Sequence, residues 1–193
     1  MNALELLKND HEKVSAILER LDQTTERAVK TRDEQFARVK ADLEAHSYIE
    51  ETVFYPALTE DSRTRAITLE ALQEHRMVKS LLDEMGSIAV DTEEWTAKLK
   101  VLKTSVDQHI KEEEGELFKQ ARQVLTKARL DELGEEMEAA RQEEPGTALT
   151  ARAASRGERS RGGARSPSRG TQRKGFSFGV SLACPLFNSF CRR

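Results

Sequence analysis

Apolar residues recur at alternating steps of three and four along four long segments of this chain, and this rhythm constrains the fold more than any other feature. Such spacing is typical of amphipathic helices that bury one face. The first segment, residues 2–28, carries the stripe Leu4, Leu7, His11, Val14, Leu18 and Leu21. The second, residues 31–58, carries the stripe Phe36, Val39, Leu43, His46, Glu50, Val53 and Ala57. Both stripes place polar side chains on a face that should be buried.

The other two segments continue the rhythm. The third runs from about Ser62 to Gly86, with the stripe Ala71, His75, Val78, Leu82 and Met85. The fourth starts after an N-cap at Asp91 or Thr92, and its stripe is Trp95, Leu99, Leu102, Val106, His109, Glu113 and Leu117. Again a histidine lies on each stripe, and the fourth stripe also carries a glutamate.

The ends of the second segment carry local signals of their own. Thr31 followed by Glu34 has the spacing of a capping box, which predicts a helix start there. Pro56 and the polar residues that follow it end this helix or bend its last turn. Residues 129–143 predict a short fifth helix packed on the others.

Four amphipathic helices of similar length with short connections predict an all-α fold, an antiparallel up-down-up-down four-helix bundle. We expect this domain to span residues 1–144. Residues 145–193 are rich in Arg, Ser and Gly and predict a disordered tail. The tail holds ten Lys and Arg against the single acid Glu158, which leaves the domain with 21 basic and 33 acidic residues, a net charge of −12.

Charge and cysteine content narrow the class of partner. An acidic domain does not attract nucleic acid or anionic lipid through its overall field, so nucleic acid is expected only as weak binding through the basic tail. Both cysteines, Cys184 and Cys191, lie in the tail, so the domain has no thiol for a disulfide, an iron–sulfur cluster or nucleophilic catalysis. With no signal-like N-terminus and no apolar run of about 20 residues, we expect a cytoplasmic protein without a membrane span.

The four histidines are predicted to lie at one height. If the turns fall near residues 29, 60 and 91, each histidine lies at a similar distance from the turn that joins it to its neighbour. At a rise of about 1.5 Å per residue, the four rings fall within roughly 3 Å of one layer. Glu50 and Glu113 each follow a histidine by four residues and reach into the same layer.

One such residue alone is as well explained by packing, as a hydrogen-bonded core histidine or an ion-paired glutamate. All six together are not, because desolvated carboxylates need a counter-charge and no Arg or Lys shares the stripes. Imidazole and carboxylate are ligands of iron, zinc or manganese, and six exceed what one four-coordinate zinc uses. The hypothesis is two metal ions bridged by Glu50 and Glu113, one held by His11 and His46 and the other by His75 and His109.

Four motifs carry a family resemblance: DHEKV, HSYIEETVFYP, EHRMVKSLL and HIKEEEGELF, in this order and helical context. They resemble the hemerythrin-like HHE cation-binding domain over about residues 2–142. The resemblance implies a cofactor of two non-haem iron ions, oxo- or hydroxo-bridged. The implied ligands are His11, His46, Glu50, His75, His109 and Glu113. It also implies a small ligand such as O2, NO or peroxide, and a role in binding or sensing oxygen, nitric oxide or the redox or iron state.

One departure concerns Lys79, which stands where oxygen-carrying members have a second histidine on the third helix; water, Glu112, Glu114 or an exogenous ligand would fill that place. Glu114 is also an alternative to Glu113 as the carboxylate ligand, although the stripe favours Glu113. Tyr48 and Tyr55 are expected off the buried seam, as packing residues. Two other functions stay open: a di-iron oxidase- or peroxidase-like enzyme, and a metal-free structural or interaction bundle.

Overall fold

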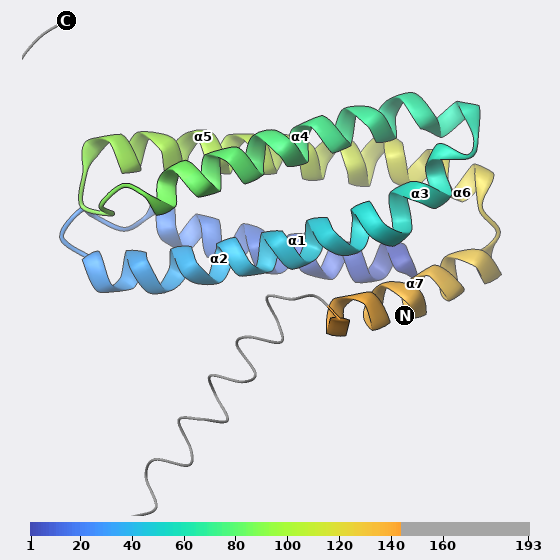
Figure 1. The fold of residues 1–193 in the computed structure, drawn as a ribbon, viewed down its shortest axis with the longest axis horizontal. Helices are drawn as coiled ribbons and strands as arrows, with labels where there is room; N and C mark the ends of the chain where they lie inside the picture. Colours follow the sequence, from blue (N-terminus) through green and yellow to red (C-terminus); the bar gives the residue numbers. More distant parts are fainter. Residues whose placement is uncertain (144–193) are drawn as a thin grey trace, which may run out of the picture.

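The computed structural model describes residues 1–143 and is helical through most of that range (Figure 1). The elements are α1 (Ala3–Asp22), α2 (Val29–Ile49), η1 (Glu50–Phe54), α3 (Tyr55–Thr59), α4 (Ser62–Gly86), α5 (Glu93–Glu112), η2 (Glu113–Leu117), α6 (Phe118–Val124) and α7 (Lys127–Glu143). The predicted all-α class is confirmed for these residues. No helix among them is long and apolar enough to cross a membrane. The predicted disorder of residues 145–193 lies outside the described residues.

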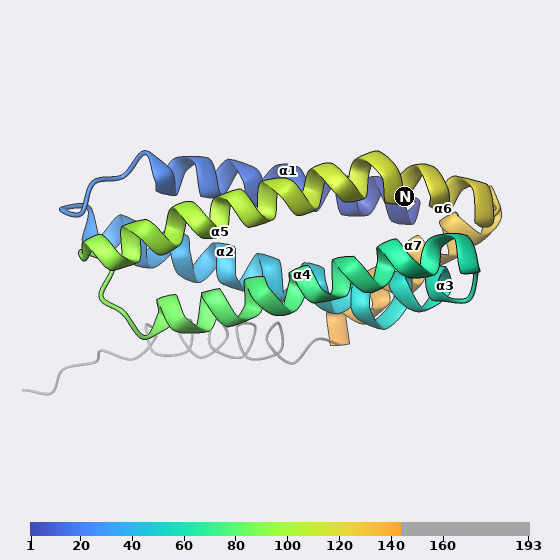
Figure 2. The ribbon, with the colours of Figure 1, turned by 90° about the horizontal axis from the view of Figure 1, so that it is seen from above.

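The long helices lie alongside one another in both views of the ribbon (Figures 1 and 2). Helix α1 packs on α2 and α5, and α4 packs on α5. The segments α2, η1 and α3 follow one another without a break, as do α5, η2 and α6. Helix α7 lies across the end of this assembly where the chain begins, against α1, α2 and η1.

The helix starts confirm one capping prediction and correct another. Thr92 caps α5 by accepting a hydrogen bond from the Trp95 backbone at 3.1 Å, and it was one of the two expected caps. The capping box at Thr31 and Glu34 is wrong, because α2 already begins at Val29 and has no side-chain cap.

Arg32 explains why α2 starts early. Its guanidinium is buried and donates hydrogen bonds to the carbonyl oxygens of Thr24, at 3.0 Å, and Val90, at 2.7 Å. It also lies 5.0 Å from the ring of Trp95. These contacts join two loops and fix the first turn of α2 through a buried cation. The spacing of apolar residues could not predict this start, because Arg32 is not an apolar residue.

Two π-helical turns, η1 and η2, interrupt the regular helices. In each, a backbone N–H bonds five residues back: Tyr55 to the carbonyl of Glu50, and Phe118 to the carbonyl of Glu113. One extra residue in a turn rotates the face that follows.

The rotation corrects the predicted stripe after Glu50. Val53 and Ala57 were expected in the core but are only half-buried, whereas Phe54, Tyr55 and Leu58 are fully buried. Pro56 is exposed in the first turn of α3, and the helix continues past it to Thr59. The helix therefore ends at Thr59, the first of the polar residues that were expected to end it, and its change of pitch comes before the proline.

The apolar core falls into two clusters with a polar layer between them. One cluster contains Leu4 and Leu7 of α1 and continues into η1, α3, α6 and α7. The other contains Val14 and Leu18 and continues along α2, α4 and α5 toward the loops at the opposite end. On α1, His11 lies between the two clusters.

Helix α7 closes the end of the structure where the chain begins, close to the predicted residues 129–143. Its apolar residues Leu130, Leu133 and Met137 are buried in the first cluster. At Gly134 the backbone of α7 comes so close to the backbone of residues 1–3 that a Cβ atom there would collide with the Met1 carbonyl oxygen. Arg141 pairs with Asp10 of α1.

Candidate metal centre

The structure brings together all six residues of the predicted layer. Each histidine comes from a different helix, and none is more than 7% exposed. Glu50 and Glu113 are 0% and 2% exposed, and each is the first residue of a π-helical turn. Their side chains form two groups with metal-ligating potential, one of His11, His46, Glu50 and Glu113, the other of Glu50, His75 and His109.

The histidines meet in pairs through their Nε2 atoms. The Nε2 atoms of His11 and His46 are 3.2 Å apart, and those of His75 and His109 are 3.3 Å apart. These are the two pairs that the sequence assigned to separate ions.

The two carboxylates reach both pairs. Glu50 Oε2 lies 3.1 Å from Nε2 of His46 and 3.2 Å from Nε2 of His75. Glu113 Oε2 lies 3.1 Å from Nε2 of His11 and, more loosely, 3.8 Å from Nε2 of His109. Glu50 therefore belongs equally to the two groups, in the position of a bridging carboxylate.

These separations fit ligands around a metal ion better than a network of hydrogen bonds. Two ligand atoms that each lie about 2.1 Å from one ion are separated by roughly 3.0 to 3.4 Å. Both oxygens of Glu50, and Oε2 of Glu113, are buried without a hydrogen-bond partner although nitrogens lie close by. The atoms converge without the angles of hydrogen bonds, and a cation would satisfy them.

Each imidazole also meets an acidic side chain at its outer nitrogen, Nδ1. The pairs are His11 with Glu114 at 2.9 Å, His75 with Glu51 at 2.9 Å, His109 with Glu74 at 2.8 Å and His46 with Asp10 at 3.8 Å. A carboxylate at Nδ1 holds the proton there and turns the Nε2 lone pair inward, which is the usual support of a metal-binding histidine. The sequence analysis named Glu114 only as an alternative ligand and missed the other three acids, although every histidine motif contains an acid beside the histidine or a few residues away.

Neither Glu114 nor Glu112 lies among the Nε2 atoms of the layer, and Lys79 forms an ion pair outside it. Glu114 accepts from His11 Nδ1, on the outer side of the ring, and Glu112 is exposed. The Lys79 amine donates to both oxygens of Glu51, at 2.8 and 2.9 Å. Hydrogen bonds from His75 and then Lys79 lower the pKa of Glu51 to about 2, so this carboxylate stays charged beside His75.

Tyr55 is a correction to the sequence analysis, which placed it off the seam. It is 1% exposed, and its hydroxyl lies 3.3 Å from His75 Nε2 and donates to Glu113 Oε1 at 3.2 Å. The π-helical turn causes this, because it places the fifth residue after Glu50 on the face that an α-helix gives to the fourth. Tyr48 is half-buried and packs against the first apolar cluster, as expected.

Burial and mutual contact shift the pKa values of the side chains in the layer in different directions. Burial disfavours a charge on His11, but contact with Glu113 outweighs it and raises the pKa of His11 to about 9. Burial lowers the pKa of its neighbour His46 to about 4. Burial, reinforced by the charge of Glu113, raises the pKa of Glu50 well above its usual value. Without metal, a proton on His11 thus supplies part of the positive charge, and a metal ion would displace it.

A cavity of about 20 Å³ adjoins the layer on the side of the second apolar cluster. Its walls are the four histidines together with Val14, Leu43, Ser47, Val78, Val106 and Ile110. This is room for one water-sized group. The apolar walls favour an uncharged ligand of two or three atoms over an organic substrate.

Comparison with known proteins agrees with this geometry. The sequence profile of the hemerythrin HHE cation-binding domain matches residues 2–121. A crystal structure of a hemerythrin HHE cation-binding domain-containing protein from Mycobacterium kansasii superposes with a TM-score of 0.67 at 28% identity, covering 78% of this chain and 91% of that one. A DNA nickase from Nostoc sp. strain PCC 7120 is 28% identical over 146 residues, 73% of this chain but only 39% of the nickase.

Proposed function

Since the chain belongs to the hemerythrin HHE cation-binding domain family, we propose that its six-residue layer holds two non-haem iron ions and binds or senses O2, NO or a redox change. The proposed ligands are His11, His46, Glu50, His75, His109 and Glu113. We take the long helices as the antiparallel up-down-up-down bundle expected from the sequence, and the protein as cytoplasmic. We also propose that the hemerythrin-like domain spans residues 1–144.

The observation that carries the proposal is the position of Glu50. Its carboxylate is fully buried, lacks a hydrogen-bond partner and lies within 3.2 Å of one histidine from each pair. A single ion at either pair leaves the other pair of facing Nε2 atoms without a shared cation. Two ions with Glu50 between them satisfy both pairs at once.

The protein's own groups have distinct roles in such a site. The acids at Nδ1 of His11, His75 and His109 orient these three rings and point their Nε2 atoms into the layer. The small apolar cavity admits a ligand of two or three atoms and excludes larger reductants. Iron, when bound, would supply reversible binding of small ligands and one-electron redox chemistry.

One observation favours the enzyme alternative, an oxidase- or peroxidase-like reaction on O2 or peroxide. The Tyr55 hydroxyl is buried at the His75 and His109 end of the layer, where it donates to Glu113. Burial, reinforced by the charges of Glu50 and Glu113, raises the pKa of Tyr55 well above its usual value, so the phenol keeps its proton. A fixed phenol can donate a proton to a bound oxygen ligand.

The activity named for the Nostoc relative is not part of the proposal. This chain matches 39% of that protein, so most of the nickase has no counterpart here. Residues 1–144 carry a net charge of −12, which repels a DNA backbone. A nucleic-acid role would rest on the basic residues 145–193 alone.

Metal content and an aerobic absorption spectrum test the proposal. Full-length protein from iron-supplemented cells should contain two irons per chain and an absorption band that dithionite removes. His46→Ala should lose metal, because it removes one Nε2 from a facing pair, whereas Glu44→Gln, on the exposed face of the same helix, should keep it. Well-folded protein that never takes up metal would instead support the structural bundle.

Turnover separates the sensor from the enzyme. A sensor should show a stoichiometric spectral change with O2, NO or peroxide. Sustained peroxide consumption with a supplied reductant, lost in Tyr55→Phe, would favour the enzyme.

A further inference from the structure

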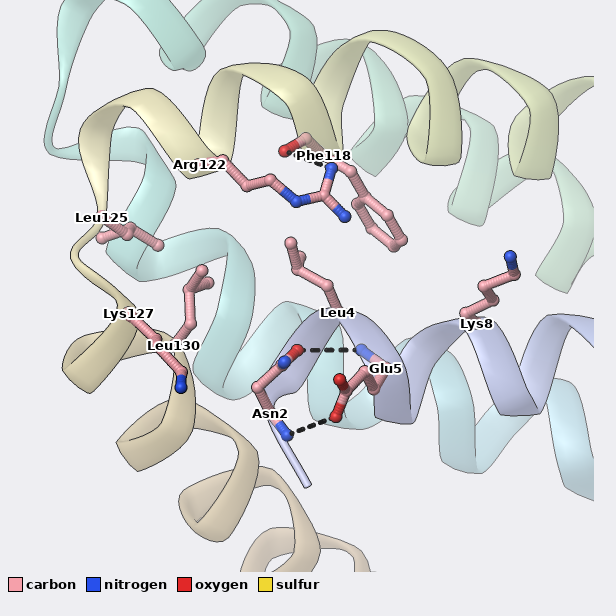
Figure 3. A pocket seen from close by; sticks show the side chains of 9 residues that line it. All are labelled: Asn2, Leu4, Glu5, Lys8, Phe118, Arg122, Leu125, Lys127 and Leu130. Carbon is pink, nitrogen blue, oxygen red and sulfur yellow. Dashed lines mark hydrogen bonds between the residues drawn. The ribbon is translucent and has the colours of Figure 1, made fainter.

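A second and larger cavity lies outside the metal layer, where the start of α1 meets α6 and α7. Its volume is about 450 Å³, within the usual range for small-molecule sites. It is lined by Asn2, Leu4, Glu5, Lys8, Phe118, Arg122, Leu125, Lys127 and Leu130. Figure 3 shows these side chains around the cavity, on the three helices and on the loop between α6 and α7.

The lining separates into an apolar floor and a cationic rim. Leu4, Phe118 and Leu130 are buried and form an apolar surface together with half-buried Leu125. Lys8 and Lys127 stand on opposite sides of the cavity in Figure 3, and Arg122 extends between them above Leu4.

The three rim cations make no ion pair within residues 1–143. Arg122 has one long hydrogen bond, 3.4 Å to the Phe118 carbonyl oxygen. The acid in the lining is Glu5, whose carboxylate accepts from the Asn2 backbone N–H in the capping box of α1. Neighbouring cations on the same three helices are paired: Lys13 with Asp10, Lys119 with Glu116, and Arg129 with Glu132 and Glu136.

Three cations without an ion pair in the described part of the chain line one cavity in a domain whose net charge is −12. Like charges gathered without counter-ions repel one another, and a bound anion relieves the repulsion. The apolar floor supplies the second half of a recognition site, because it gains stability only when an apolar group covers it. Cationic rim and apolar floor together specify a ligand with one anionic head and an apolar body.

We propose that this cavity binds an amphipathic monocarboxylate, with its head on the Arg122 guanidinium and its chain over Leu4, Phe118 and Leu130, while Lys8 and Lys127 add positive charge on the two sides. Arg122 is the central residue, since its planar guanidinium can hold both carboxylate oxygens. The site is separate from the metal ligands and does not depend on them.

Phe118 places the cavity next to the metal layer without making it part of that layer. Its ring contributes to the cavity floor and also stacks on the ring of His11, with centroids 6.3 Å apart and planes 14° apart. A ligand in the cavity would therefore contact an aromatic ring that touches a proposed metal ligand.

Isothermal titration of the full-length protein with octanoate tests the proposal. Octanoate should bind at one molecule per chain, whereas acetate, which lacks the body, and octanol, which lacks the charge, should bind much more weakly. Arg122→Gln should weaken octanoate binding about tenfold, because it removes the charged partner of the head, and Lys8→Gln should weaken it by a smaller factor, because it removes only a charge from the rim. Lys119→Gln, the same change of charge on α6 outside the cavity, should leave the affinity unaltered.

The controls also separate this site from the ten basic residues of 145–193. Binding through those residues would appear with acetate as well and would not respond to Arg122→Gln. Octanoate binding of equal affinity in Arg122→Gln and Lys119→Gln, or no saturable binding, would overturn the proposal. Thermal melts of the variants exclude a loss of fold, which is not expected because all three substituted side chains are exposed.

Discussion

Glu50→Gln should change stability in opposite directions with and without metal. In the metal-free protein, the carboxylate is fully buried and neither oxygen has a hydrogen-bond partner. An amide of the same shape carries no charge, and its N–H groups can donate to the Nε2 atoms of His46 and His75, which lie 3.1 and 3.2 Å from Oε2. Metal-free Glu50→Gln should therefore be more stable than the parent protein.

The magnitude follows from the cost of the unsatisfied group. Leaving one buried polar group without a partner costs about 1–3 kcal/mol, and more for a charged group. We expect the free energy of unfolding to rise by about 1–2 kcal/mol. At this chain length each kcal/mol raises the melting temperature by roughly 3 °C.

With metal the order should reverse. A ligand at a thousand times its dissociation constant stabilises the folded state by about 4 kcal/mol. If the loss of the proposed bridging carboxylate weakens metal binding about a hundredfold, only about 1.4 kcal/mol of this stabilisation remains at the same metal concentration.

Urea denaturation measures the free energy of unfolding without metal, in the presence of a chelator, and with metal, in the presence of ferrous iron under anaerobic conditions. Glu44→Gln is the control, because it removes a carboxylate from the exposed face of the same helix and should change neither by more than about 0.5 kcal/mol. A metal-free Glu50→Gln protein less stable than the parent would mean that Glu50 is already satisfied in the polar layer. Iron and chelator giving the same parent stability would refute the need for a cation.

Two further perturbations test other parts of the structure. Gly134→Ala should destabilise the protein by about 1–3 kcal/mol in urea denaturation, because the new Cβ collides with the Met1 carbonyl, whereas Gly86→Ala, with open space around it, should have a neutral or stabilising effect. Tyr55→Phe should retain two irons per chain but lose about 1 kcal/mol of stability with its buried hydrogen bond to Glu113; loss of iron would show that the phenol itself holds metal.

Much of the layer could be predicted from the sequence because helical periodicity acts over long distances. Counting residues from three turns was enough to place four histidines at one height, since a rise of about 1.5 Å per residue tolerates errors of one or two positions. The stripes of α1, α4 and α5 predicted buried residues such as Leu18, Leu82 and Leu102 for the same reason.

What could not be predicted depends on local deviations and on atoms beyond Cβ. The π-helical turns leave no mark in an apolar pattern read at steps of three and four, so Tyr55 was placed on the wrong face. The role of the acids at Nδ1 was missed because they lie beside the stripes rather than on them, and which acid contacts which ring depends on how neighbouring helices pack. Glu74 is an example, because it is next to His75 in sequence but forms a hydrogen bond with His109 on the neighbouring helix.

The two halves of the layer share one pattern, and the point at which they differ gives the layer two unlike ends. In each half a histidine is followed four residues later by a buried glutamate and, five residues after that, across a π-helical turn, by a buried aromatic ring. The aromatic residue is Tyr55 in one half and Phe118 in the other. Tyr55 presents a hydroxyl to His75, whereas Phe118 presents only a ring face to His11. The two proposed metal positions, equivalent in the spacing of their proposed ligands, are therefore inequivalent in their surroundings, and we expect an oxygen ligand that needs a hydrogen-bond donor to bind at the end near His75.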